Sequence, residues 1–85
     1  MIWEWFHICT SYTPHAKQRM MQRKVSPEQV VEAIESPDEI LPGDNGEEIA
    51  VRRYGIREVR VVYEEIDVDT VVVYTVMKSR VRDWR

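Results

Sequence analysis

The sequence predicts an α+β domain in which two N-terminal helices pack on one face of an antiparallel β-sheet, in the order β-α-α-β-β-β. Two closely spaced helix-start signals lie in the N-terminal half, and the C-terminal half is rich in β-branched residues with short connections between them. A chain of 85 residues suits one small domain with a core just large enough to fold. Residues 1–85 are therefore expected to form a single domain.

The helices are predicted from capping residues. In Thr13-Pro14, the hydroxyl can cap a helix and the proline fits its first position, which predicts a helix over 14–24. Ser26-Pro27 repeats the signal, with a glutamine three residues after the serine as in a capping box. The second helix is expected over 27–35, because Pro37 disfavours its continuation.

The strands are predicted from runs of β-prone residues. The aromatic stretch 2–8 is expected to enter the sheet as an edge strand. Residues 37–48 are interpreted as a loop with a short extended piece at Ile40–Leu41. The remaining strands are expected over 48–54, 58–66 and 70–78. Their short connections indicate an antiparallel meander.

Charge is unevenly distributed along the chain, whose net charge is −3. Residues 1–50 carry four basic and nine acidic side chains, giving −5, whereas residues 51–85 carry eight basic and six acidic ones, giving +2. An acidic block spans 28–48. A bipolar domain of this kind can bind an anion on one side, although a committed nucleic-acid binder is usually basic throughout. The composition thus argues mildly against tight RNA binding.

The clearest functional signal lies in residues 13–24, which carry four basic side chains, one histidine and no carboxylate. His15, Arg19 and Arg23 recur at i, i+4 and i+8, so they spread over only roughly 80° of a helix surface. Such a stripe could hold a phosphodiester. In a structural alternative, the arginine stems cover the core and their guanidinium groups pair with Glu64 or Glu65. The sequence leaves both interpretations open.

The run His15-Ala16-x-x-Arg19-x-x-x-Arg23-x-Val25-Ser26 resembles the motif of the domain-of-unknown-function 4258 (DUF4258) family, and the likeness spans about residues 8–78. That family in turn resembles the BrnT and RelE toxins, small ribonucleases of toxin–antitoxin operons. The resemblance implies a RelE-like fold, RNA as substrate and a cognate antitoxin as partner. Lys24 stands where the family commonly has glycine, which predicts a different turn between the helices.

If the protein is a nuclease, its chemistry would need a proton-transfer group and cations at the phosphate. His15 is the candidate acid–base, Arg19 and Arg23 the candidate clamp, and Glu64 a candidate catalytic partner on the sheet. The candidate RNA- or anion-binding residues are Lys24, Arg52, Arg80 and Arg82. A non-catalytic module that binds a protein or an anion on the same fold, or a homo-oligomer, is the alternative.

No metal or cofactor is expected, because two histidines and one cysteine do not form a zinc pattern. No apolar run approaches the ~20 residues that cross a bilayer, so no membrane association is expected. Cys9 is the only cysteine and cannot form an internal disulfide. A reducing cytoplasm is therefore the expected compartment.

Overall fold

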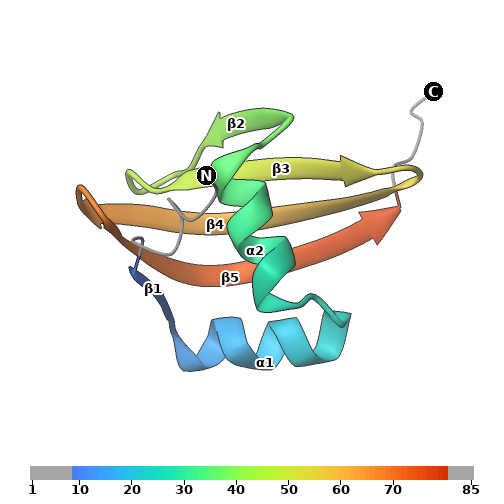
Figure 1. Ribbon diagram of the computed structural model, residues 1–85, viewed down its shortest axis with the longest axis horizontal. Helices are drawn as coiled ribbons and strands as arrows, with labels where there is room; N and C mark the ends of the chain where they lie inside the picture. Colours follow the sequence, from blue (N-terminus) through green and yellow to red (C-terminus); the bar gives the residue numbers. More distant parts are fainter. Residues whose placement is uncertain (1–8, 81–85) are drawn as a thin grey trace, which may run out of the picture.

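The computed structural model describes residues 9–80, which form two helices and a five-stranded sheet. The elements are β1 (Cys9–Tyr12), α1 (Pro14–Arg23), α2 (Pro27–Glu35), β2 (Glu39–Pro42), β3 (Glu48–Tyr54), β4 (Arg57–Asp67) and β5 (Thr70–Arg80). In Figure 1, α2 crosses in front of the sheet and α1 runs beside β5. The predicted α+β architecture is confirmed.

The strand order across the sheet is β1-β5-β4-β3-β2. The pairs β2–β3, β3–β4 and β4–β5 are antiparallel, as expected for strands joined by short turns. However, β1 pairs with β5 in parallel, with Cys9 opposite Thr70, so the sheet is mixed rather than fully antiparallel. No hairpin joins these two strands, so their relative direction could not be predicted from a short turn.

The short extended piece expected at Ile40–Leu41 is confirmed and belongs to β2, which adds a fifth strand at the far edge of the sheet. The three strands of the predicted meander are also confirmed, with β4 and β5 somewhat longer than expected. The predicted strand over 2–8 lies outside the described residues. At the turn between β3 and β4, Gly55 has φ +66°, a conformation that glycine adopts without steric cost.

Both helices begin with the predicted caps. Thr13 Oγ1 accepts a hydrogen bond from the N–H of Ala16 at 3.0 Å, and it donates to the carbonyl oxygen of Tyr74, also at 3.0 Å. The hydroxyl of Thr13 therefore starts α1 and also ties it to β5. Ser26 and Gln29 form the reciprocal capping box at the start of α2, with bonds of 3.1 and 3.2 Å.

The core lies between the helices and one face of the sheet. Ala16 and Met20 of α1 and Val30 and Ala33 of α2 are buried there. They belong to one cluster with strand residues that include Val59, Val61, Tyr63, Val73 and Val76. This packing fixes the rotation of α1, because its buried residues face the sheet. Among the described residues, no helix is long and apolar enough to span a membrane.

Candidate anion-binding surface

The predicted basic stripe lies on α1, and we call His15, Arg19 and Arg23 the helix stripe. His15 and Arg23 are exposed and Arg19 is half-buried, whereas Ala16 of the same helix is fully buried against the sheet. Within residues 9–80, no side chain of the stripe forms an ion pair or a hydrogen bond. The structural alternative, in which Glu64 or Glu65 would neutralise the arginines, is not what the structure shows.

Cations elsewhere divide into two groups. Arg52, Arg53 and Arg60 lie within ion-pair distance of carboxylates. In the part of the chain that the structure describes, the other lysines and arginines form no ion pair. They all lie on α1, directly after it, at the first residue of β4 or among the last residues of β5. These are Lys17, Arg19, Arg23, Lys24, Arg57, Lys78 and Arg80. The unpaired positive charge is therefore concentrated on one side of the domain.

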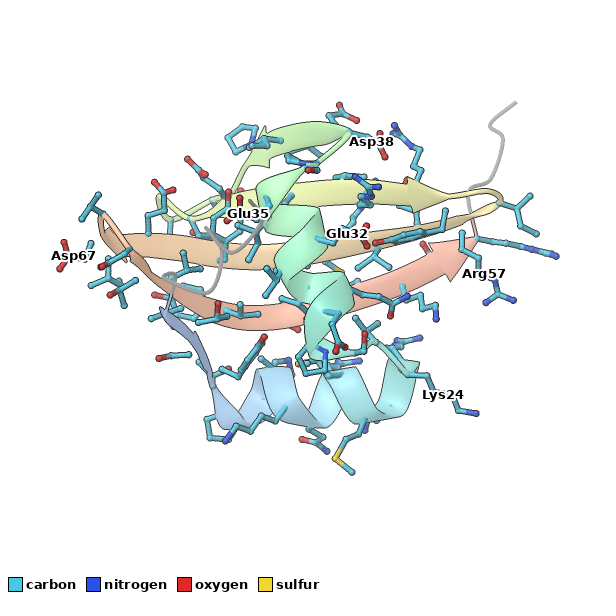
Figure 2. The ribbon with its side chains drawn as sticks, in the orientation of Figure 1. Lys24, Glu32, Glu35, Asp38, Arg57 and Asp67 are labelled. Carbon is cyan, nitrogen blue, oxygen red and sulfur yellow. The ribbon has the colours of Figure 1, made fainter. Side chains whose placement is uncertain are left out.

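The second part of this positive charge lies where β4 begins and β5 ends, and we call Lys24, Arg57 and Arg80 the sheet-end cluster. Arg57 and Arg80 are directly paired in the β4–β5 register, and all three residues are exposed. Lys78 Nζ donates to the carbonyl oxygen of Lys24 at 3.4 Å, which places the end of α1 against β5. Figure 2 shows Lys24 and Arg57 at the same end of the molecule, with Asp67 at the opposite end.

Lys24 ends α1 in a left-handed conformation, with φ 57° and ψ 50°. The N–H of Val25 donates to the carbonyl oxygen of Met20 at 2.9 Å, and the N–H of Lys24 to that of Met21 at 3.4 Å. These bonds form a Schellman motif, the usual helix end with glycine at the left-handed position. The prediction of a different turn is wrong, because the lysine itself takes the conformation that glycine favours.

Arg52, predicted to contact an anion, is occupied within the fold. Its Nη1 donates to the carbonyl oxygen of Ser36 at 2.5 Å, and its Nη2 lies 3.6 Å from Glu32 Oε2. The guanidinium also lies over the ring of Tyr54, at 5.6 Å from the centroid, and the Tyr54 hydroxyl donates to Glu32 at 2.7 Å. Arg52 thus fastens the end of α2 to β3 and does not join the helix stripe. Arg82 lies outside the described residues.

Glu64 also lies apart from the helix stripe. It accepts a hydrogen bond of 2.6 Å from the hydroxyl of Tyr74, and this bond raises the pKa of Tyr74 above its ordinary value. In the register, Glu64 is the partner of Val72, close to the β4–β5 turn. No hydrogen bond or ion pair within residues 9–80 joins Glu64 to His15, Arg19 or Arg23. A register shift between Val62 and Tyr63, which the sequence did not reveal, determines this pairing.

The arrangement can bind an anion through arginine and lysine side chains that have no ion-pair partner within residues 9–80. Arginine presents a planar fork that matches two phosphate oxygens, and lysine offers a compact charge. The described residues contain no group of three or more side chains that could hold a metal ion. The side chains that α1 offers to an anion are guanidinium and ammonium groups, with the imidazole of His15 on the same helix.

The part of the chain that matches a known family covers most of the fold and most of the candidate surface. A family model described as a domain of unknown function (DUF4258) matches residues 12–78, which is most of the chain. The matched span contains the whole helix stripe together with Lys24 and Arg57, and it ends before Arg80. No curated protein and no solved structure matches the chain significantly.

Proposed function

Because this chain belongs to the DUF4258 family, whose description assigns no activity, we propose a function from its own residues: RNA binding through α1, with metal-free cleavage by His15. The observation that supports it best is the helix stripe, which projects from a packed helix without a carboxylate partner in residues 9–80. The resemblance of the family to BrnT and RelE toxins, which we expect from the sequence motif, favours RNA over other polyanions.

The fold supports binding because α1 is held rigidly. Ala16 and Met20 anchor one side of the helix in the core, and Thr13 ties its first turn to β5. The stripe on its outer side is therefore preorganised, and an incoming phosphate does not have to order the helix. Preorganisation of this kind increases affinity by reducing the entropy lost on binding.

Cleavage would proceed by attack of the neighbouring 2′-hydroxyl. His15 accepts the hydroxyl proton, the 2′-oxygen forms a bond to phosphorus, and the bond from phosphorus to the 5′-oxygen breaks. The departing oxygen takes a proton from solvent, and the products are a 2′,3′-cyclic phosphate and a 5′-hydroxyl. Arg19 and Arg23 stabilise the negative charge that builds on the phosphoryl oxygens.

A second candidate is a non-catalytic module that binds RNA or another anion on the same surface. One observation favours it: Glu64, the expected second catalytic group, accepts a hydrogen bond from Tyr74 and forms no hydrogen bond or ion pair with the helix stripe within residues 9–80. In this alternative, RNA binds but remains intact.

The test combines a binding and a cleavage assay on an unstructured RNA. Arg19→Gln with Arg23→Gln should weaken binding, whereas His15→Ala should abolish cleavage while the RNA still binds. Asn45→Asp with Val68→Asp is the matched control, because it makes the net charge two units more negative at exposed positions away from α1. Binding without cleavage would favour the second candidate. No binding, or equal loss in the control, would refute both.

A further inference from the structure

The sheet-end cluster contains charge repulsion that no residue of the range 9–80 relieves. Arg57 and Arg80 are direct partners across β4 and β5, and like charges in directly opposed positions destabilise a strand pair. Neither side chain forms an ion pair or a hydrogen bond with another residue in the range 9–80. Arg53 and Arg60, by comparison, share the carboxylate of Glu58. Within the described residues nothing offsets the repulsion between Arg57 and Arg80, and a bound anion would do so.

Lys24 adds a third cation at a conformational cost. A non-glycine residue in the left-handed region costs roughly 1–2 kcal/mol relative to the right-handed one. Glycine would form the same Schellman motif without that cost. The lysine side chain forms no hydrogen bond or ion pair within residues 9–80, since only its backbone carbonyl is bound by Lys78. The left-handed conformation therefore costs stability, and within residues 9–80 the lysine side chain forms no hydrogen bond or ion pair that would offset this cost.

The two observations concern one place on the molecule. The contact between Lys78 and the Lys24 carbonyl joins the end of α1 to β5, two residues before Arg80. Arg23, the last residue of the helix stripe, directly precedes Lys24. The sheet-end cluster is therefore continuous with the helix stripe, and together they form a positive path from α1 onto the sheet. Because α1 has ten residues, its length alone is about 15 Å.

We propose that the sheet-end cluster is a second phosphate-binding site, which holds the RNA backbone where the strand continues beyond the helix stripe. This inference rests on the proposed function, and it specifies the ligand as a single-stranded oligonucleotide rather than a mononucleotide. An oligonucleotide fits because its phosphates are linked and can occupy cations along the whole path. The site makes no base contact and so contributes affinity without sequence preference.

The test measures the affinity of the full chain for a uridine octanucleotide at several salt concentrations. The logarithm of the binding constant falls as the logarithm of the salt concentration rises, and for a single strand each cation lost makes this slope shallower by about 0.7. Arg57→Gln with Arg80→Gln should therefore lower the slope by about 1.4, which corresponds to about 25-fold weaker binding at 0.1 M salt relative to a 1 M reference. Arg19→Gln with Arg23→Gln, the helix-stripe variant, should show a similar loss.

The outcomes separate the two proposals. If both double variants lose affinity and the Asn45→Asp, Val68→Asp control does not, both proposals stand. If only the helix-stripe variant loses affinity, the proposed function survives and the second site is refuted. If only the sheet-end variant does, the helix stripe is not the RNA site and both proposals fail as stated. Circular dichroism of each variant confirms that the fold is intact, and inorganic phosphate serves as the competitor that tests for binding of single ions.

Discussion

Replacing Lys24 tests the left-handed helix end directly, because Lys24→Gly and Lys24→Ala should differ in stability but lose the same RNA affinity. In Lys24→Ala the strained conformation remains, whereas in Lys24→Gly it is relieved. Removing the strain stabilises the folded protein by roughly 1–2 kcal/mol. The greater conformational freedom of glycine in the unfolded chain subtracts about 0.5–1 kcal/mol from that gain. We therefore expect the glycine variant to be more stable than the alanine variant by about 1 kcal/mol, which for a domain of this size raises Tm by about 4–8 °C.

The comparison with alanine is the informative one because both variants lose the same charge. A cation near a helix C-terminus is itself favourable by about 0.3–1 kcal/mol, so the gain of Lys24→Gly over the parent protein is smaller. Urea unfolding of the three proteins measures the differences. RNA affinity should fall equally in both variants, since each removes one cation from the sheet-end cluster. Equal stability of the glycine and alanine variants would refute the left-handed conformation at this position.

Three further predictions concern single side chains. Thr13→Ala should lose the N-cap and the hydrogen bond to Tyr74, which lowers the free energy of unfolding by about 2 kcal/mol. Denaturant titration measures this loss, and Thr13→Ser, which keeps the hydroxyl, should be nearly as stable as the parent protein. Burial, and then the hydrogen bond to Glu48, raise the pKa of Tyr63. The neutral Tyr63 hydroxyl should therefore contribute its full stabilisation below about pH 10, and this stabilisation should decline at higher pH. The prediction is contradicted if urea unfolding of a Tyr63→Phe variant shows the same alkaline decline. Arg52→Gln should lower stability by about 1–2 kcal/mol, and RNA affinity that fell as far as in the helix-stripe variant would show that Arg52 binds RNA after all.

The elements that the sequence predicted correctly are those with local causes. Thr13 and Ser26 lie within three residues of the N–H groups that they cap, so α1 and α2 could be predicted from their start signals. The meander of β3, β4 and β5 followed from its short turns. The parallel pairing of β1 with β5 could not be predicted in this way, because Cys9 and Thr70 meet only through the packing of the whole chain.

The residues of the candidate site also divide into those that local sequence could predict and those whose environment depends on long-range pairing. Predicting the helix stripe required only the helical period, and in the structure His15 and Arg23 are exposed while Arg19 is half-buried. Arg52 was expected within the strand 48–54 and Arg57 just before the strand 58–66, and the sequence did not show how their environments differ. Arg52 meets Ser36 and Glu32 of the α2 region, whereas Arg57 faces Arg80. Which arginine is free depends on long-range pairing, and no local pattern carries that information.

The most direct test of the central claim, that α1 is an open binding surface for RNA, is a residue-resolved NMR titration with a uridine octanucleotide. We predict that the backbone amide signals of α1 and the side-chain signals of His15 shift with added RNA, and that those near Asp67, at the opposite end of the molecule, do not. Shifts confined to the end of the molecule that carries Asp67, or no shifts at all at low salt, would contradict the account.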